Sequence, residues 1–200
     1  MYQLLESIRI ENRVLHNIEL HNKRFNMARK ALWRQSNLID LRTIIDIPEE
    51  LNNERYKCRI VSNRQTINYE IKPYVQRKVE TLKIVIDNNI DYTYKTSNRK
   101  MLDKAFEQRN NCDDIIVIKN NLLTDAWAAN IVLFNGEKWL TPKKPLLKGT
   151  QREYLLTIGK IYEQNIHLSD IKSFETIKLI NAMIDFDRAP AINVEKGVFY

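Results

Sequence analysis

Segments with the two-residue period of a β-strand and segments with the longer period of an α-helix alternate along the whole chain. Strands are predicted over 3–10, 55–62, 65–72, 80–86, 114–119, 130–134, 138–141 and 175–181. Helices are predicted over 19–34, over 97–109 with Ser97 as the N-cap, and over 150–160. Because both kinds of segment occur in both halves, the pattern predicts an α+β or α/β fold.

Polar and proline-containing segments separate these elements. Ser62-Asn63-Arg64 and Asn135-Gly136 predict hairpin turns, and Asn120-Asn121 predicts a turn after the apolar run DIIVIK. Around Pro48 one helical stretch is expected to end and a short one to begin. Pro73 and the charged residues after it are typical of a connection between two halves. We therefore predict a small N-terminal domain over 1–76 and a larger C-terminal domain over 77–200.

Composition argues against several classes of protein. No apolar run reaches the roughly 18 residues that span a bilayer, and the N-terminus lacks the pattern of a secretory signal. We therefore expect a cytoplasmic protein without a membrane partner. Cys58 and Cys112 form no CxxC pair, which favours two reduced, buried thiols. His16 and His21 do not have the spacing of helical metal ligands, so no metal site is expected.

The net charge of +7 favours an anionic partner, which could be a nucleic acid or a small molecule. The helix predicted over 19–34 is rich in basic side chains: Lys23, Arg24, Arg29, Lys30 and Arg34. No aromatic stacking platform, zinc pattern or recognition-helix motif accompanies them. A small anionic ligand is therefore the preferred interpretation, and a module that binds nucleic acid or a protein partner is the non-enzyme alternative.

Three segments contain residues that could carry out chemistry. Lys95 follows a predicted strand and is flanked by Tyr92 and Tyr94, aromatic residues that could partly desolvate its amine and lower its pKa, as suits a Schiff-base lysine. Asp125 lies among small residues shortly before a strand. Gly149-Thr150, at a predicted helix start, offers backbone N–H groups and a hydroxyl to an anion. Taken singly, they are better explained as a solvated lysine, an ordinary turn aspartate and a simple helix cap.

Taken together and in order, these segments resemble the class IV aminotransferases. The order is a lysine after a strand, an acid-containing turn with an asparagine, and Thr-Pro followed by Leu, Gly and Arg before a helix. Leu5-Glu6-Ser7-Ile8-Arg9 is similar to the family's FE-x-I-R strand, and His21-Asn22-Lys23-Arg24-Phe25 is similar to its H-x-x-R-L helix start. Leu179-Ile180-Asn181-Ala182-Met183 resembles the strand and turn in which the family has N-S or G-T.

The resemblance implies a pyridoxal 5'-phosphate (PLP) enzyme of fold type IV, the α+β fold of D-amino-acid aminotransferase, assembled as a homodimer. It places Lys95 at the Schiff-base lysine, Asp125 at the glutamate that pairs with the pyridine nitrogen, and Arg24 at the phosphate-binding arginine. The remaining phosphate contacts fall on Thr150, Gln151, Asn181 and Ala182. Aspartate is one methylene shorter than glutamate, so the cofactor must lie closer to Asp125 or a water must intervene. Several family loops are missing, which could move part of the site's wall to a partner subunit.

Within the family, the residues after Lys95 favour aminodeoxychorismate lyase, which yields 4-aminobenzoate and pyruvate for folate synthesis. Asn98-Arg99 is similar to the Asn-Arg of that lyase, whereas branched-chain enzymes tend to have Gly-Gly-Asn-Tyr in this region. Arg99 is therefore expected to bind the substrate, and a basic chain suits a dicarboxylate. The enzyme alternative is a branched-chain or D-amino-acid aminotransferase of class IV.

Overall fold

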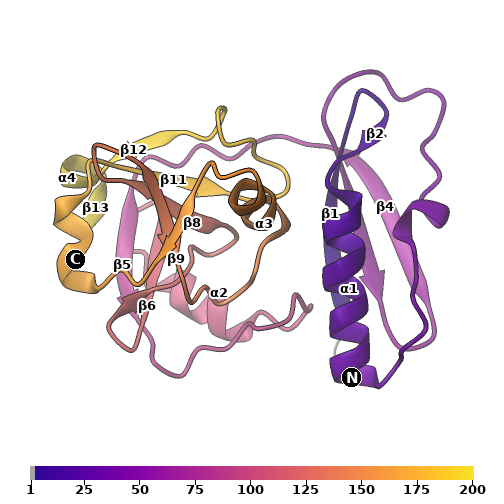
Figure 1. Cartoon of the computed structure of the whole chain (residues 1–200), viewed down its shortest axis with the longest axis horizontal. Helices are drawn as coiled ribbons and strands as arrows, with labels where there is room; N and C mark the ends of the chain where they lie inside the picture. The colour runs from indigo at the N-terminus through magenta and orange to yellow at the C-terminus, as the bar shows by residue number, and fades with distance from the viewer. Residues whose placement is uncertain (1–2) are drawn as a thin grey trace. The chain divides into compact units, whose positions relative to one another are not determined.

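The structure of the chain is a computed structural model that describes residues 3–200. It comprises two compact units (Figure 1). Unit 1 contains the described residues up to Gln76 together with Tyr94–Asn98, and unit 2 contains Arg77–Thr93 and Arg99–Tyr200. Each unit has its own apolar core. None of the helices in residues 3–200 is long and apolar enough to cross a membrane.

A four-stranded antiparallel sheet and one long helix form unit 1. The sheet has the order β2-β1-β3-β4 and consists of β1 (Leu4–Glu11), β2 (Val14–Leu15), β3 (Tyr56–Ser62) and β4 (Ile67–Pro73). Helix α1 (Ile18–Trp33) runs beside the sheet, and a single 3-10 turn, η1 (Leu41–Thr43), follows it (Figure 1). Side chains alternate along β1, so Leu4 and Ile8 pack in one cluster with Phe25 of α1.

The segment that contains Lys95 is part of unit 1 because it is hydrogen-bonded to the start of β1. The Leu5 amide donates to the Lys95 carbonyl at 2.8 Å, and the Ser97 amide donates to the Gln3 carbonyl at 2.8 Å. Ser97 is therefore hydrogen-bonded to Gln3, and the prediction that it caps a helix is wrong. Helix α2 (Lys100–Glu107) begins three residues later, with Arg99 at the N-cap position.

Unit 2 contains two sheets. The first has the order β13-β5-β6-β7 and consists of β5 (Leu82–Ile86), β6 (Asp114–Lys119), β7 (Leu122–Leu123) and β13 (Val198–Phe199). The second has the order β10-β9-β8-β11-β12 and consists of β8 (Asn130–Phe134), β9 (Trp139–Pro142), β10 (Tyr162–Gln164), β11 (Thr176–Ile180) and β12 (Ala191–Asn193). The helical elements besides α2 are α3 (Thr150–Thr157), η2 (Leu168–Ser173) and α4 (Val194–Gly197).

The main core of unit 2 is shared by its two sheets. One apolar cluster contains Ile84 and Ile116 of the first sheet with Leu133 and Ile177 of the second. On the other face of the first sheet, Ile115 packs in a cluster with Leu102 of α2. On the other face of the second sheet, Val132 packs in a cluster with Leu155 of α3. Strands β6 and β8 are thus buried on both faces, which explains why each is a continuous apolar run.

The mixed α+β fold and the predicted hairpins are confirmed. Strands β3 and β4 pair antiparallel, as do β8 and β9, and Asn120 and Asn121 turn the chain with φ of 51° and 62°. Helix α3 ends at Thr157, earlier than predicted, because Gly159 follows it with φ of 68°, outside the helical region.

The helix expected around Pro48 is wrong. Residues 44–55 form no helix, and the Arg13 guanidinium donates instead to the carbonyls of Pro48 at 2.9 Å and Glu49 at 2.7 Å. The expectation of two buried thiols is confirmed for Cys58, where burial raises the pKa to about 12. Cys112 is only half-buried, so that part of the expectation is corrected.

Candidate active site

A buried carboxylate joins β1 to α1 inside unit 1. Arg24 Nε donates to Glu6 Oε1 at 2.9 Å, and Arg24 Nη2 donates to Glu6 Oε2. His21 Nδ1 lies 2.7 Å from the same Oε2 atom. Glu6 is 1% exposed and His21 is 0% exposed, whereas the Arg24 side chain is 17% exposed. The guanidinium therefore reaches from a buried anchor toward the surface.

The two-residue repeat of strand β1 and the helical repeat of α1 bring these side chains together. Glu6 lies on the face of β1 that also carries Leu4 and Ile8, because alternate residues of a strand share one face. His21 and Arg24 are three residues apart on α1 and thus share one side of the helix. The helix packs this side onto the strand, so the carboxylate meets both helical side chains at once.

The charges in this cluster are well defined. Burial by itself would raise the pKa of Glu6, but the charge of Arg24 and the contacts with His21 lower that pKa to about 2. Burial lowers the pKa of His21, and the charges of Arg24 and Lys95 lower it further, against the opposing effect of Glu6. At neutral pH the carboxylate is therefore ionised and the imidazole is neutral, so Nδ1 donates its hydrogen to Glu6.

Lys95 also belongs to unit 1 and lies near the cluster of Glu6, His21 and Arg24. Its carbonyl is fixed to the amide of Leu5, one residue before Glu6. Its ammonium is near enough to His21 to lower the pKa of that imidazole. Lys95 as a whole residue is half-buried. Unit 1 thus brings together Lys95 and Arg24, two of the predicted site residues.

In unit 2, Asp125 is a buried acid with fixed partners. It is 4% exposed, and it accepts a hydrogen bond from Asn130 Nδ2 at 2.7 Å and one from the Leu147 amide at 2.8 Å. Burial raises the pKa of Asp125 to about 7, although these hydrogen bonds and the charge of Arg152 oppose the rise. The carboxyl group therefore changes its protonation state close to neutral pH.

Asn130 connects this acid to the start of α3. Its Nδ2 also donates to the Leu147 carbonyl at 2.8 Å. A Cβ atom added to Gly149 would lie only 2.0 Å from Asn130 Oδ1, so a larger residue at this point requires the Asn130 side chain to move. Gly149 is the N-cap residue of α3, and Thr150 and Gln151 behind it are 3% and 5% exposed. The acid and the helix start are thus parts of one packed arrangement.

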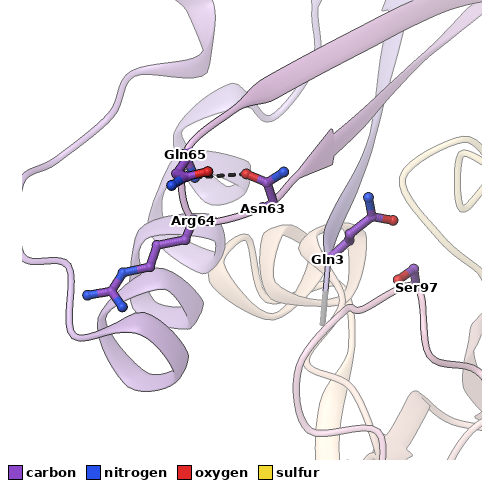
Figure 2. A pocket seen from close by; sticks show the side chains of 5 residues that line it. All are labelled: Gln3, Asn63, Arg64, Gln65 and Ser97. Carbon is purple, nitrogen blue, oxygen red and sulfur yellow. Dashed lines mark hydrogen bonds between the residues drawn. The ribbon is translucent and has the colours of Figure 1, made fainter. Parts of the chain in front are cut away.

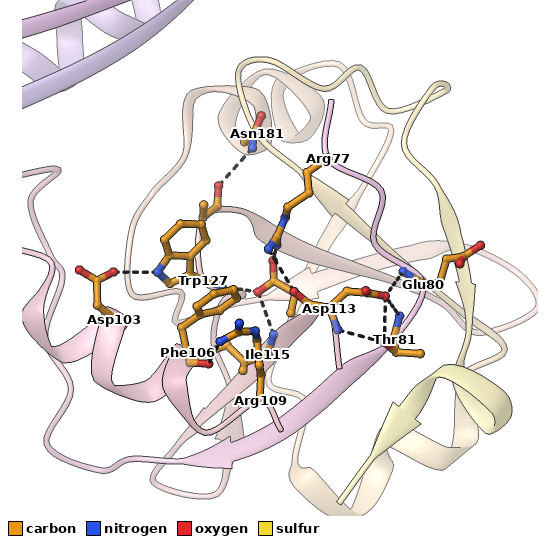
Figure 3. A network of polar contacts seen from close by, with 12 residues as sticks. Arg77, Glu80, Thr81, Asp103, Phe106, Arg109, Asp113, Ile115, Trp127 and Asn181 are labelled. Carbon is orange, nitrogen blue, oxygen red and sulfur yellow. Dashed lines mark hydrogen bonds and ion pairs between the residues drawn. The ribbon is translucent and has the colours of Figure 1, made fainter. Parts of the chain in front are cut away.

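The turn at Asn181 and Ala182 is tied to the same region. Asn181 Nδ2 donates to the Ala128 carbonyl at 3.1 Å (Figure 3). Ala128 lies in the turn between Asp125 and Asn130. Asn181 Oδ1 accepts from the Met183 amide at 2.9 Å, which closes the turn. Unit 2 therefore brings the predicted acid, the predicted helix start and the second predicted phosphate turn into one connected set.

Arg99 lies in unit 2 and is held against aromatic rings. Its Nη2 donates to the Trp127 carbonyl at 2.7 Å, and its guanidinium carbon lies 5.0 Å from the Trp127 ring and 5.3 Å from the Tyr92 ring. The Trp127 indole donates to Asp103 at 2.8 Å and stacks on Phe106 at 4.5 Å between centroids (Figure 3). Arg99 is thus positioned by the turn that contains Asp125.

A polar pocket of about 440 Å³ lies in unit 1, and none of the predicted site residues lines it (Figure 2). Its walls are formed by Gln3, Asn63, Arg64, Gln65 and Ser97. Asn63 accepts the Gln65 amide at 2.8 Å within the β3–β4 turn, so its amide oxygen is part of that turn.

The sequence motifs contained Glu6 and Asn130 but assigned them no role. Glu6 had a detectable signal, because it is the polar residue at a strand position whose neighbours on the same face, Leu4 and Ile8, are apolar. The sequence signal for Asn130 was weaker: it lies five residues after Asp125 in the chain. The side-chain contacts of both residues needed the structure.

Comparison with known proteins connects this geometry to a family. The model of the family described as amino-transferase class IV matches residues 3–187. An uncharacterized protein from Haemophilus influenzae is 40% identical over 185 residues, which cover 92% of this chain and 98% of that protein. This relative matches the chain over almost its full length.

Solved structures extend the comparison. A candidate 4-amino-4-deoxychorismate lyase from Haemophilus somnus has a TM-score of 0.84 at 34% identity, over 92% of this chain and 97% of that one. A candidate amino-acid aminotransferase from Mesorhizobium loti has a TM-score of 0.80 at 18% identity, over 96% and 98%. A PLP-bound hypothetical aminotransferase from Mycobacterium tuberculosis has a TM-score of 0.75 at 13% identity, over 95% and 80%. The chain belongs to the class IV aminotransferase family and is a PLP-dependent enzyme of fold type IV.

Proposed function

We propose that this enzyme is a 4-amino-4-deoxychorismate lyase, which releases 4-aminobenzoate and pyruvate for folate synthesis. The observation that carries the proposal is Asn98-Arg99 shortly after Lys95, a pair that resembles the lyase and differs from the Gly-Gly-Asn-Tyr of branched-chain enzymes. The 34% identity to the Haemophilus somnus protein supports the same choice. A cytoplasmic homodimer is part of this proposal.

The donor set of the described residues fits PLP. The cofactor offers an aldehyde, a pyridine nitrogen and a phosphate, which call for an amine, an acid and anion-binding groups. Lys95, a half-buried residue, supplies the amine, and Asp125 supplies the buried acid. Arg24 and the start of α3 supply a permanent positive charge and helix N–H groups. PLP, when bound, supplies the electron sink of the reaction.

Lys95 and Asp125 then have complementary tasks. The Lys95 amine removes the proton from the amine-bearing carbon of the substrate, which is general base catalysis. Asp125, as a carboxylate, keeps the pyridine nitrogen protonated, because a nearby negative charge favours the cationic form. The electron pair left by this proton completes the aromatic ring of 4-aminobenzoate as the C–O bond to the enolpyruvyl group breaks, and the released enolpyruvate takes up a proton to become pyruvate. An aminotransferase would instead convert the substrate amine to a keto acid.

The remaining residues bind and orient. Arg24 and the backbone N–H groups of Thr150, Gln151, Asn181 and Ala182 hold the phosphate. Arg99 binds a carboxylate of the substrate, and its contact with the Trp127 carbonyl fixes the direction of its guanidinium. An arginine suits this task because it stays charged and offers a planar set of donors.

Two measurements test the proposal. Borohydride reduction of the PLP-loaded protein, followed by peptide mapping, should label Lys95, and Lys95→Ala should abolish the label. The exposed Lys100, five residues further on, is the matched control, and Lys100→Ala should leave the label in place. Purified protein should form 4-aminobenzoate from aminodeoxychorismate. Formation of glutamate from leucine and 2-oxoglutarate, with no 4-aminobenzoate, would favour the aminotransferase and reject the lyase.

A further inference from the structure

We infer that Glu6 is a positioning residue, which fixes the Arg24 guanidinium in the orientation that receives the cofactor phosphate. This inference rests on the proposed function, because it takes Arg24 as a phosphate ligand. It adds a role for a buried side chain that does not itself touch the phosphate.

Burying the charged carboxylate of Glu6 costs free energy unless the carboxylate has hydrogen-bonding or charged partners. Its neighbours on the same face of β1, Leu4 and Ile8, are part of the apolar core, and Glu6 is just as deeply buried at 1% exposure. An apolar residue would fit the pattern of the strand. A buried ion pair contributes little or nothing to stability compared with apolar residues of similar volume. Stability therefore does not explain why this position holds a glutamate.

The contacts hold the guanidinium along one edge. Both carboxylate oxygens of Glu6 accept from Arg24, through Nε and Nη2. The carboxylate is itself held by His21, whose Nδ1 is 2.7 Å from Oε2. A guanidinium with its Nε edge fixed cannot rotate about the last bonds of its side chain. Because removing the rotamer freedom of an arginine costs free energy, a side chain that is already fixed binds an anion more tightly.

Although the contacts of Glu6 orient Arg24 for phosphate binding, the negative charge of Glu6 opposes that binding. A carboxylate near a phosphate repels it, so removing the charge would mix a gain in attraction with a loss of orientation. Glu6→Asp avoids this ambiguity, because it keeps the charge and withdraws the carboxylate by one methylene. A positioning role predicts that this small displacement weakens phosphate binding.

The experiment compares the affinity of the cofactor-free protein for PLP with its affinity for pyridoxal, which lacks the phosphate. In the wild-type protein PLP should bind more tightly than pyridoxal. Glu6→Asp should lower the affinity for PLP about tenfold, the change that 1.4 kcal/mol produces, and leave the affinity for pyridoxal unchanged. A general loss of structure would weaken both ligands equally. An unchanged ratio of the two affinities in a folded Glu6→Asp protein overturns the inference.

Two further variants show whether Glu6 acts through Arg24. In an Arg24→Ala background, Glu6→Asp should have no additional effect on the ratio, and an additive effect contradicts the inference. Glu11→Asp is the matched control, since Glu11 lies on the same strand and accepts from Arg55 Nη2 at 3.1 and 3.0 Å. It should leave the ratio unchanged. If the wild-type protein itself does not prefer PLP over pyridoxal, the assignment of the phosphate site fails, and the proposed function fails with it.

Discussion

The carboxyl group of Asp125 is stabilised in its protonated form by burial and in its ionised form by two N–H donors. Burial prevails, and the folded-state pKa is about 7, above the ordinary value of 3.8. Between these two values the folded protein binds a proton that the unfolded chain does not bind. The contribution of Asp125 to stability is therefore largest at low pH and is lost as the pH rises toward 7.

This difference can be measured in cofactor-free protein. We expect the wild type to lose stability relative to Asp125→Asn between pH 4 and pH 7, by on the order of 4 kcal/mol, and the difference to be constant above pH 7. Urea unfolding of both proteins at several pH values gives the comparison. A difference that does not vary with pH would show that Asp125 has an ordinary pKa in the folded protein.

The same residue carries a catalytic prediction. Asp125→Ala should still bind PLP through Lys95 and the phosphate contacts, but its kcat should fall on the order of 100-fold, because a preorganised charge acts mainly on the transition state. Asp125→Glu, which has the family's usual acid, should retain activity. Normal turnover by Asp125→Ala would mean that the acid is another residue.

At the residue scale, a site residue could be predicted from the sequence only when it belongs to a short motif. Lys95, Asp125 and Arg24 could be proposed because each belongs to a short motif in the expected order. The contact of Glu6 with Arg24 joins residues 18 positions apart, and that of Asn130 with Leu147 joins residues 17 apart. No local pattern specifies such pairs, because they form only when a helix packs on a strand or when a loop meets the start of a strand.

At the scale of elements, the start of α3 depends on one glycine. The φ of Gly149 is −72°, which alanine can adopt, so the constraint is steric and comes from Asn130. Gly149→Ala should displace the Asn130 side chain and weaken its contacts with Asp125 and Leu147. We expect a loss of about 1 to 3 kcal/mol in the free energy of unfolding and weaker retention of PLP.

The steric explanation has its own control. Adding Asn130→Ala to Gly149→Ala removes the clash, so the double variant should be more stable than the sum of the single changes predicts. Gly159→Ala should cost about 1 kcal/mol through its positive φ alone, because nothing lies within 4 Å of its added Cβ, and PLP retention should not change. Strict additivity at positions 149 and 130 would exclude the clash.

The elements that sequence patterns predicted are the longer ones with a clear period. The apolar run of β6 and the apolar stripe of α1 can be recognised in the sequence, because each element buries several of its own side chains in a core. Strands β10, β12 and β13 have only two or three residues, and each is a strand because it pairs with a neighbour. The helix expected near Pro48 does not form, and the Pro48 and Glu49 carbonyls there accept hydrogen bonds from the distant Arg13 side chain, which no local pattern specifies.

At the scale of the whole molecule, the residues proposed to hold PLP come from both compact units. Lys95 and Arg24 belong to unit 1, whereas Asp125, Thr150 and Asn181 belong to unit 2. Each unit has its own apolar core. The mixed α+β fold could be predicted from the sequence, because the segments that build each core have the apolar period of a strand or of a helix.

The last prediction concerns the oligomeric state of the enzyme. The family resemblance implies a homodimer in which the active site lies near a subunit boundary, and two-fold dimers are the commonest closed oligomers. Light scattering of the PLP-loaded protein should give twice the chain mass of 23.8 kDa. Dilution should lower the specific activity in parallel with the dimer fraction, because a subunit that contributes to its partner's site is needed for turnover. Full activity at the mass of one chain would contradict the dimer and would show that a single subunit carries the complete site.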